Sequence, residues 1–535
     1  GHPFGGIQPA DCPGQLADRS AYAMERVAQY LAQRRHSLRA VYAGSAGEKN
    51  IQESKLTPIS YMTSYDAIIV GSGPNGLAAA ITLAQAGQKV LVLEAKDTVG
   101  GGTRTAEITL PGFRHDICSA IHPLGLASPF FRDLPLAEFG LEWIAPPTAL
   151  AHPLDDGRTA VLTRSLEETT ASLGEDGHAY QKLMEPLAKS WQAILGDILG
   201  PLPLPPKHPV ALTRFGLLAL RSARGLAESR FRGDPAQALF GGLAGHGMLP
   251  LEEITTASIA LVLGILAHAV GWPIPKGGSQ AITNSMAAYL ESLGGEIVTG
   301  QEVTSLDELP ASQAVLLDIT PRQILRICGD TLPSTYRRQL EKYRYGAGVC
   351  KVDFALGEPI PWKADACKRA GTVHLGGTLE EISASEKDVW RGKHPENPLV
   401  LLAQQSLFDD TRAPTGQHTA WAYCHVPHGS NVDVSEKIIN QIVRFAPGFR
   451  DLILAKHVHT ATQMESYNPN YIGGDINGGV QDWRQLFTRP VARWSPYTTP
   501  VKGLFICSSS TPPGGGVHGM CGYHAAKTVL LKHRA

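Results

Sequence analysis

Three glycines in a G-x-G-x-x-G arrangement stand in the stretch Val70-Gly-Ser-Gly-Pro-Asn-Gly76. The apolar run before them, Tyr65–Val70, predicts a strand that is buried on both faces. The run after them, Leu77–Ala86, predicts a helix, and Lys89–Leu93 predicts a second buried strand that leads into Glu94. This order of strand, glycine turn, helix, strand and acidic residue is typical of a dinucleotide-binding βαβ unit.

Each glycine of the motif has a physical role in such a site. Gly71 permits the tight turn, Gly73 lets the backbone approach the pyrophosphate, and Gly76 lets helix and strand pack closely. The start of the helix offers unpaired N–H groups and a partial positive charge to the phosphates. We therefore assign Pro74 and Asn75, which lie inside the motif, to the cofactor site as well.

The acidic residue narrows the choice of dinucleotide. Glu94 can accept hydrogen bonds from the ribose hydroxyls of adenosine, and its charge would repel a 2′-phosphate, which disfavours NADP. Ala95 is assigned to the same site. The glycines of Val99–Arg104 indicate backbone that passes close to a flat or charged group, and Arg104 can reach a phosphate. NAD and FAD both remain open on these residues, as do a βαβ unit without ligand and a plain glycine-rich turn.

These motifs resemble the start of FAD-dependent phytoene (carotenoid) desaturase and retinol saturase-like oxidoreductases. The resemblance lies in Gly71–Glu94, in Gly100-Gly-Gly-Thr-Arg104 and in Leu110-Pro-Gly-Phe-Arg-His-Asp116. Within that superfamily the chain looks most like the pyridine-nucleotide-disulfide-oxidoreductase-domain protein 2-like group, and amine oxidases share the first half. The resemblance implies FAD, with Glu94 on the ribose. It also implies that four residues lie near the pyrophosphate and flavin, namely Gly101, Gly102, Thr103 and Arg104.

The middle of the chain carries the pattern of a returning half of such a flavin domain. The stretch Ile274-Pro-Lys-Gly-Gly-Ser-Gln280 indicates a turn before a helix over Ala281–Leu293. A glycine turn, a strand ending near Val303 and a short strand over Ala314–Asp318 are expected to follow. The resemblance places Pro275–Gln280 close to the flavin and the backbone of Val303 on the adenine. A structural turn without ligand is the alternative.

The C-terminus carries a second glycine-rich loop. Gly503–Cys507 predicts a buried strand, Ser508–Met520 a polar loop, and Cys521–Lys532 a helix. The loop repeats the G-x-G-x-x-G frame, but two prolines interrupt it and too few residues follow for a second site. We therefore predict that this helix points its N-terminus at the same cofactor, where its dipole would stabilise negative charge on the reduced ring. The contacts assigned here are Ser509, Gly516, Val517 and His518.

The family resemblance continues to the end of the chain, with one departure. Matching stretches are Asn468–Asp475, Arg489-Pro490, Tyr497–Pro500 and the Pro-Gly-Gly-Gly-Val loop. Many related flavoproteins have Gly-Asp after the last strand, where the Asp binds ribitol or phosphate. Here Ser508–Ser510 stand instead.

Candidate residues for chemistry and substrate contact are few. His518 is the candidate catalytic residue, because it lies among glycines in the loop aimed at the flavin, and a positioning or packing role is the alternative. His122 and Tyr523 are candidate substrate contacts, since they flank the two flavin-contact stretches. The sequence has no paired carboxylates, zinc-ligand spacing or nucleophile elbow, so hydrolase and metal sites are disfavoured.

Composition excludes several other classes. The 535 residues carry a formal net charge of −1, which gives no indication of nucleic acid. The eight cysteines are scattered, and free thiols in a reducing compartment are expected. No apolar run is long enough to span a bilayer, and Ala257–Trp272 predicts a core helix that could also line a hydrophobic tunnel. We expect a cytoplasmic protein, with peripheral contact to a membrane as a further possibility. That possibility rests on the basic amphipathic stretch 207–232, for which an ordinary surface helix is the alternative.

The predicted fold class is α/β, with a discontinuous Rossmann-type (two-dinucleotide-binding-domain) FAD domain and an inserted mixed α+β substrate domain. An extension over residues 1–61, with a helical stretch over 22–38, precedes it. The predicted parts of the FAD domain are 62–130, 274–334 and 491–535. Those of the substrate domain are 131–273, with a proline-rich hinge at 201–206, and 335–490.

The resemblance implies an FAD-dependent oxidoreductase of the desaturase, saturase or dehydrogenase type. It would move a hydride between flavin N5 and a carbon of an apolar, isoprenoid or polyene-like substrate. Because no separate nicotinamide domain is visible, electrons should pass to or from oxygen, a quinone or a diffusing reductant. The alternatives are a flavin amine oxidase-like enzyme, a redox-neutral flavin-dependent isomerase, and a protein whose FAD is structural.

Overall fold

The computed structural model describes residues 64–201 and 205–534 of the chain. The predicted extension over residues 1–61, with its helical stretch, lies outside the described residues. The middle of the proline-rich segment 201–206 does so as well.

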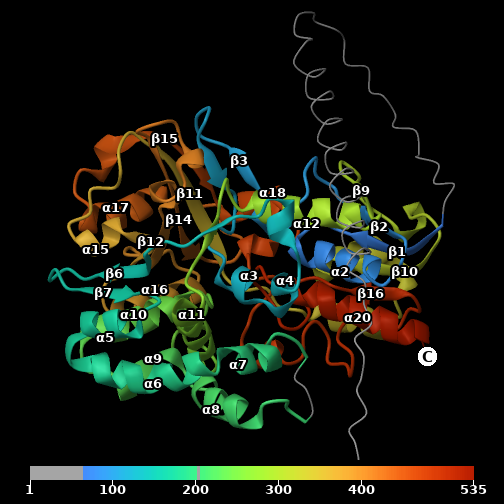
Figure 1. Ribbon diagram of the computed structural model, residues 1–535, viewed down its shortest axis with the longest axis horizontal. Coiled ribbons are helices and arrows are strands. Elements are labelled where there is room, and N and C mark those ends of the chain that lie inside the picture. The colour runs from blue at the N-terminus through green and yellow to red at the C-terminus, as the bar shows by residue number, and fades with distance from the viewer. Residues whose placement is uncertain (1–63, 202–204, 535) are drawn as a thin grey trace, which may run out of the picture. The chain divides into compact units, whose positions relative to one another are not determined.

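Five parallel strands form the sheet that carries the glycine motif, in the spatial order β16–β10–β1–β2–β9. Their bounds are β1 Tyr65–Val70, β2 Val90–Leu93, β9 Glu296–Val298, β10 Ser312–Leu317 and β16 Leu504–Ile506. The strands come from three distant parts of the chain and lie together on the right of Figure 1. This confirms the predicted α/β, Rossmann-type fold with a discontinuous nucleotide-binding domain. The boundaries given for its parts stay predictions.

Three helices pack on this sheet, with bounds α2 Pro74–Ala84, α12 Gln280–Ser292 and α20 Met520–Arg534. Ile69 of β1, Met286 of α12 and Val529 of α20 belong to one buried apolar cluster, whose removal from water stabilises this layer. A Cβ at Gly522 would lie 1.8 Å from the carbonyl oxygen of Asn75, so α20 crosses the start of α2 at a distance that only glycine permits. The opening turn and the closing helix therefore meet, as the sequence predicts.

A second sheet of seven strands has the order β15–β11–β14–β13–β12–β6–β7, and it lies on the left of Figure 1. Adjacent strands within this sheet are antiparallel, except for β12 and β6, which are parallel. The bounds are β6 Thr148–Pro153, β7 Thr159–Leu162, β11 Gly348–Leu356, β12 Ala370–Leu375, β13 Val400–Ala403, β14 His418–Val426 and β15 Ile453–His459. Two short antiparallel pairs are β3 Thr105–Glu107 with β4 Arg114–Asp116, and β5 Trp143–Ile144 with β8 Ile274–Pro275.

The two faces of the second sheet pack against different partners. On one face, Phe354 of β11 clusters with Ile438 of α17, which spans Ser435–Phe445. On the other face, Trp421 and Tyr423 of β14 belong to a smaller buried cluster that borders the cavity described below. Alternation along each strand therefore separates a packed core from a surface that is open to a ligand.

The rest of the described chain contains further helices joined by turns and loops. Those that follow the second sheet's first hairpin are α5 Leu166–Ser172, α6 Gly177–Lys189, α7 Trp191–Ile198, α8 Pro209–Ala219, α9 Ala223–Arg230, α10 Asp234–Gly245 and α11 Ala257–Ala269. The others are α3 Pro123–Ala127, α4 Pro129–Arg132, α13 Pro321–Cys328, α14 Ser334–Glu341, α15 Asp365–Lys368, α16 Leu379–Trp390, α18 Ala461–Tyr467 and α19 Trp483–Leu486. In the described chain, no helix has both the length and the apolar character needed to cross a membrane.

Two predicted elements differ from the structure. The strand expected to end near Val303 is β9, which ends at Val298, because the chain turns at Gly300 with a φ of 70°. The basic stretch 207–232 forms two helices rather than one, because Ser222 caps α9 by accepting a hydrogen bond from the N–H of Gly225. Its Arg224 binds three carboxylates of the protein, those of Glu228, Glu252 and Glu380.

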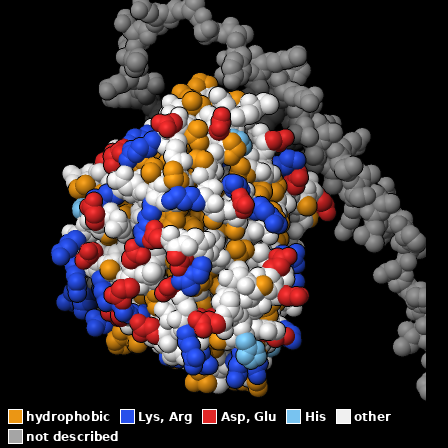
Figure 2. Space-filling view, turned by 90° about the vertical axis from the view of Figure 1, so that its left-hand side faces the viewer, with side chains coloured by type: hydrophobic (Ala, Val, Ile, Leu, Met, Phe, Trp, Pro, Cys, Tyr) orange, Lys and Arg blue, Asp and Glu red, His pale blue; other side chains and the backbone are white. Residues whose placement is uncertain are grey.

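The distribution of charged side chains on one face and the state of the cysteines can be compared with what the composition predicts. Figure 2 shows the side of the molecule that lies on the left of Figure 1, with acidic and basic side chains interspersed over most of that face. The seven cysteines within the described ranges are free and buried.

Candidate functional site

A cavity of about 400 Å³ connects the glycine motif with the second sheet. Most residues assigned to a site from the sequence line it. They are Gly71, Gly73, Pro74, Asn75, Glu94, Ala95, Gly101, Gly102, Thr103, Arg104, His122, Val303, Ser509, Gly516 and Val517. Gly76, His518 and Tyr523 lie outside this lining. Folding thus brings motifs from the N-terminal part, the middle and the C-terminal part of the chain to one cavity.

The glycine turn sits at the start of α2 and is very tightly packed. A Cβ on Gly76 would lie 2.1 Å from the carbonyl oxygen of Gly71, so this position holds the turn against the helix. The helix begins with Pro74, which has no N–H, and Asp318 accepts the N–H of Gly76, so Asn75 supplies the donor that α2 leaves at its start. Lys96 and Arg326 line the same end and add positive charge.

The carboxylate of Glu94 braces this turn. One oxygen accepts hydrogen bonds from the backbone N–H and the hydroxyl of Ser72, at 3.0 and 2.6 Å. The other accepts from the N–H of Lys96 and from the guanidinium of Arg104, each at 2.9 Å. Arg104 therefore contacts Glu94 here, together with the carbonyl oxygens of Thr98 and Gly101. The contact of Glu94 with ribose and that of Arg104 with a phosphate stay predictions.

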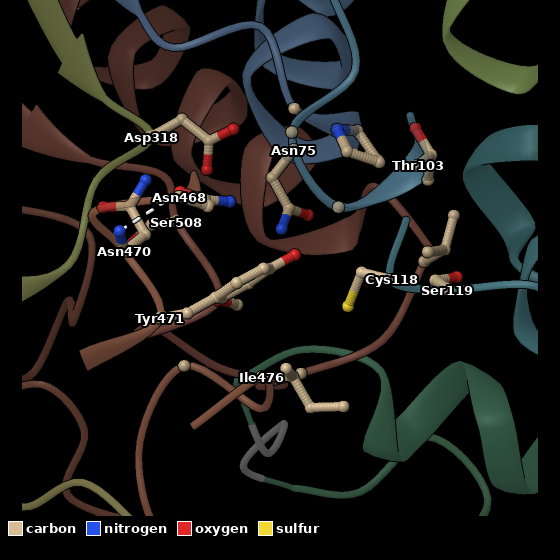
Figure 3. Close-up of a pocket in the computed structure, with 18 of the residues that line it drawn as sticks. Asn75, Thr103, Cys118, Ser119, Asp318, Asn468, Asn470, Tyr471, Ile476 and Ser508 are labelled. Carbon is tan, nitrogen blue, oxygen red and sulfur yellow. Dashed lines mark hydrogen bonds between the residues drawn. The ribbon is translucent and has the colours of Figure 1, made fainter. Parts of the chain in front are cut away.

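The structure adds a second carboxylate that the sequence analysis did not single out. Asp318 follows β10, and its Oδ2 accepts a hydrogen bond from the N–H of Gly76 at 2.9 Å. Figure 3 shows it pointing toward the start of α2 near Asn75. Burial raises the pKa of Asp318 well above its usual range, against the hydrogen bond from Gly76, and the charge of Glu94 adds to the rise. The sequence does indicate Asp318 as a site residue, because it directly follows a buried parallel strand and ligands bind at the carboxyl ends of such strands.

The C-terminal loop also lines the cradle. Ser508 and Ser509 line the cavity after β16, and the hydroxyls of Ser508 and Ser510 lie 2.6 Å apart. These serines stand where the resembled flavoproteins carry an acid. Their hydroxyls can bind a ligand, but no carboxylate of this loop reaches the cavity.

His518 has a structural contact at this loop. Its Nδ1 accepts a hydrogen bond from the N–H of Met520 at 3.0 Å, which fixes the start of α20. Its Nε2 is buried without a partner within the described chain, and burial lowers the pKa of the ring to about 4. Tyr523 is half-buried and packs against Phe130, with ring centroids 5.9 Å apart. Catalytic and substrate-contact roles for the two residues stay predictions.

The far end of the cavity is mainly apolar and is bordered by the second sheet. Its lining there comes from several elements, namely Ile121, His246, Leu263, Trp272, Thr372, Leu401, Trp421, Tyr423 and Ile476. His122 lies between the two ends. Both of its ring nitrogens are engaged, Nε2 with the hydroxyl of Ser279 at 2.8 Å and Nδ1 with that of Ser119 at 3.3 Å. Burial lowers its pKa to about 4, so the ring is neutral near pH 7.

A buried ionic network lies next to this lining. The carboxylate of Asp116 accepts hydrogen bonds from Arg412 and from the N–H of Ser279, each at 2.7 Å. On β11, the ammonium of Lys351 is paired with Asp353 and faces the ring of Trp421 at 5.7 Å. Burial lowers the pKa of Lys351, although Asp353 opposes the shift. The network joins loops of the nucleotide-binding part to the second sheet.

The residues at the nucleotide end fit a dinucleotide. The start of α2 offers the N–H of Asn75, and the cationic Lys96 and Arg326 line this end, where Arg326 is paired with Glu302. The side-chain oxygen of Asn75 is buried without a partner in the described chain, and it lines the cavity. A buried amide oxygen without a partner is costly, so a ligand donor at this place would relieve it.

Comparisons with known proteins agree with this geometry. The family of NAD(P)-binding Rossmann-like domains matches residues 69–134. The chain is 26% identical to pyridine nucleotide-disulfide oxidoreductase domain-containing protein 2 of Mus musculus, over 87% of this chain and 93% of that protein. It is 24% identical to the neurosporene-forming phytoene desaturase of Rhodobacter capsulatus, over 85% of this chain and 92% of that protein. The resemblance to this superfamily is thereby confirmed.

A solved structure shows the same fold in another kind of enzyme. Wild-type putrescine oxidase bound to putrescine matches with a TM-score of 0.57 and 19% identity, covering 88% of this chain and 100% of that one. At this identity the likeness concerns the fold alone. The chain therefore has an oxidoreductase fold, oxidoreductase relatives and a cradle for a dinucleotide.

Proposed function

We propose that the protein is an FAD-dependent oxidoreductase of the desaturase, saturase or dehydrogenase type, acting on an apolar substrate. One observation carries the proposal: a single cavity runs from a dinucleotide cradle to an apolar lining on the second sheet. A bound dinucleotide and an apolar molecule would then share one cavity, as hydride transfer between them requires.

FAD is the cofactor that this chain supports best. The glycine motif with Glu94 would hold the adenosine and pyrophosphate, and Ser508 with Ser509 would face the remainder of the molecule. The start of α20 comes from the far end of the chain and would add a positive dipole end near the isoalloxazine. Bound flavin would supply the transfer of a hydride between its N5 and a substrate carbon.

The protein's own residues would orient the substrate and exclude water. Leu263, Leu401 and Ile476 offer apolar contact from three different elements, and Trp421 with Tyr423 adds an aromatic wall. His122 is held neutral by burial and fixed by two hydroxyls, so it would position groups rather than carry charge. Electrons would leave or enter through oxygen, a quinone or a diffusing reductant.

The first experiment is the visible spectrum of the purified protein. Bands of bound oxidised flavin, followed by anaerobic bleaching with apolar isoprenoids, are the expected result. A colourless preparation that refuses added FAD would overturn the proposal. Unchanged flavin with net conversion of a double-bond isomer would instead support a redox-neutral isomerase.

Amine oxidation is the second candidate, favoured by one feature of the cavity. Trp421 and Tyr423 form an edge-to-face pair with centroids 4.9 Å apart, and aromatic walls can receive a cationic substrate. Against it, the ammonium of Lys351 already lies over the ring of Trp421 and would repel a second cation. Peroxide released on addition of putrescine or cyclohexylamine would favour the amine oxidase.

A catalytic role for His518 can be separated from its structural role. The His518→Gln variant keeps a side-chain oxygen able to accept the N–H of Met520, so the start of α20 should hold. If His518 transfers a proton, this variant binds flavin but loses most substrate-dependent bleaching. If it only fixes the helix, bleaching persists and its pH profile does not change.

Peripheral membrane contact remains part of the proposal. On and just after α8, Val210, Leu217 and Leu220 are exposed, and Lys207 and Arg214 are exposed beside them. An apolar face flanked by cations is the pattern that binds anionic lipid surfaces. Co-sedimentation with phosphatidylglycerol vesicles, weakened by Leu217→Glu but retained in Leu531→Glu, is the expected result. Equal binding to neutral phosphatidylcholine vesicles would speak against it.

A further inference from the structure

We propose that the substrate of this cavity is not a bare hydrocarbon but carries an uncharged oxygen, as a hydroxyl or carbonyl, that His246 and Thr372 bind. The inference rests on the proposed function, because it concerns the far end of the same cavity. It names the substrate class more narrowly than "apolar" does.

His246 presents an imidazole nitrogen that has no partner among the described residues. The residue follows α10 and lines the cavity, from which its ring is partly accessible. Its Nε2 lies 3.1 Å from Nε2 of His374, and its ring meets the ring of Trp272 nearly at right angles, with centroids 5.9 Å apart. These contacts fix the ring. Its Nδ1 makes no hydrogen bond among the described residues and remains accessible.

The register of the second sheet places further unpartnered polar groups on the same face. Thr372 pairs with Ala403, and Ala403 pairs with Trp421, so the three side chains form one row across β12, β13 and β14. Directly paired residues share a face of the sheet. The hydroxyl of Thr372 and the indole N–H of Trp421 are both buried without a partner in the described chain, and both residues line the cavity.

The neighbouring row connects this group to His246. His374 pairs with Leu401, and Leu401 pairs with Tyr423, so the imidazole that binds His246 stands one row from Thr372. The Thr372 hydroxyl and the Trp421 indole N–H, both without a partner in the described chain, thus border an apolar space together with the accessible Nδ1 of His246. Buried polar groups in native proteins are nearly always satisfied, which indicates that a ligand supplies the missing bonds.

The bound group should be uncharged. Burial and the nearby His425 lower the pKa of His246 to about 3, so its ring offers no positive charge to a carboxylate. Lys351, the nearest buried ammonium on the sheet, is already paired with Asp353. No carboxylate lines this end either, because Glu94, Glu302 and Asp318 all belong to the nucleotide end. Neither a carboxylate nor an ammonium of the substrate would find a counter-ion.

The neutral pair of His246 and His374 can bind either a hydroxyl or a carbonyl group of the substrate. If His246 donates its Nε2 proton to His374, its Nδ1 accepts a hydrogen bond from a hydroxyl. If His374 donates instead, the Nδ1 of His246 carries a proton and donates to a carbonyl. The hydroxyl of Thr372 can accept or donate in both cases.

The test compares binding of matched C10 isoprenoids to the purified full chain. Calorimetry measures the Kd of myrcene, a hydrocarbon, and of geraniol and geranial, its hydroxyl- and aldehyde-bearing counterparts. We expect geraniol or geranial to bind about tenfold more tightly than myrcene, which is the scale of one net hydrogen bond. Equal affinity of all three in the wild-type protein would overturn the inference.

Substitutions test whether Thr372 and His246 cause the preference for the oxygen-bearing isoprenoids over myrcene. Thr372→Val keeps the side-chain shape and should reduce the preference about fivefold while leaving myrcene affinity unchanged. His246→Phe should do the same, and His246→Gln, which restores a hydrogen-bonding group, should recover part of it. Thr419→Val is the matched control, because Thr419, on β14, is also a buried hydroxyl without a partner in the described chain but does not line the cavity. If Thr419→Val lowers the preference as much as Thr372→Val does, the assignment is wrong.

Failure of this inference and failure of the proposed function give different results. Calorimetric binding does not depend on flavin reduction, so a colourless protein would end the proposed function and leave the preference measurable. A yellow protein that binds the three probes equally would end only the inference.

Discussion

The two sheets of this molecule build their halves of the cavity in different ways. The parallel sheet offers backbone N–H groups and turns encoded by contiguous motifs, such as the one between Val70 and Gly76. The mixed second sheet offers single side chains, such as Thr372 and Trp421, that meet only through the register in which β12, β13 and β14 pair. The nucleotide end of the cavity can therefore be recognised in the amino-acid sequence, whereas the end at the second sheet is formed only when the chain folds.

This difference separates a general function from a specific one. A cofactor shared by many enzymes is bound by backbone groups, which many sequences can present once the glycines are fixed. A substrate is distinguished by the side chains of a variable lining. Changes in the parallel sheet should therefore abolish cofactor binding, whereas changes in the mixed sheet should alter stability or selectivity and leave the cofactor bound.

The largest effect is expected from Gly76→Ala. Because the new Cβ would lie 2.1 Å from a backbone oxygen, α2 and β1 must move apart, at a cost of about 3 kcal/mol or more. We expect loss of the visible flavin bands together with a lower urea midpoint. Gly196→Ala in α7 is the control, since a Cβ there meets open space and should stabilise by about 0.5 kcal/mol. Retained flavin in Gly76→Ala would break the comparison.

Arg412→Met should cost a similar free energy without touching the glycine motif. It would leave the fully buried carboxylate of Asp116 without its cation, which costs about 3–5 kcal/mol. The expected result is a large fall in the urea midpoint, while flavin stays bound at low denaturant. Lys189→Gln, in an exposed pair with Glu185, should cost less than about 0.5 kcal/mol. If the two variants were equally stable, the buried network would have no role in joining the halves.

The parallel sheet could be predicted from the sequence to a greater extent than the lining on the second sheet. The first strand is predicted with its observed bounds, and the C-terminal loop is predicted beside the same cofactor, because local periodicity and turn chemistry determine both. Thr372 and His246 give no local signal, since their role depends on which strand lies beside β12 and on where α10 ends. Asp318 lies between these cases: its position after a buried strand was readable, but its contact with Gly76 required the strand order.

Asp318→Asn should change the pH dependence of both stability and flavin binding. Because burial raises the pKa of Asp318 in the folded chain, the folded state keeps a proton that the unfolded chain releases above about pH 4. Stability therefore falls as the pH rises through this window, until the raised pKa is passed. The Asn variant lacks this fall. At a pH where the carboxylate of Asp318 is ionised, the Asn variant should bind flavin on the order of tenfold more tightly, since no charge opposes the phosphates.

Urea unfolding of the flavin-free protein and flavin titration, each at pH 5.5 and pH 8, measure these effects. Asp365→Asn is the control, because that carboxylate is exposed and lies away from the cavity. Weaker flavin binding by Asp318→Asn at pH 8 would show that the carboxylate itself contacts the cofactor through hydroxyl donors. It would then replace the acid missing from Ser508–Ser510.

The smallest loss of stability is expected from removing a helix cap outside the parallel sheet. Thr378 and Glu381 form a capping box at the start of α16, with the N–H of Thr378 donating to Glu381 at 2.9 Å. Thr378→Ala should cost about 1 kcal/mol, and Thr378→Ser close to nothing, by urea unfolding. Flavin content and the geraniol preference should be unchanged in both, because the cap fixes one helix end and reaches no lining residue. A cost near that of Arg412→Met would mean that local caps, and not remote pairing, hold this region together, and the contrast between the two sheets would fail.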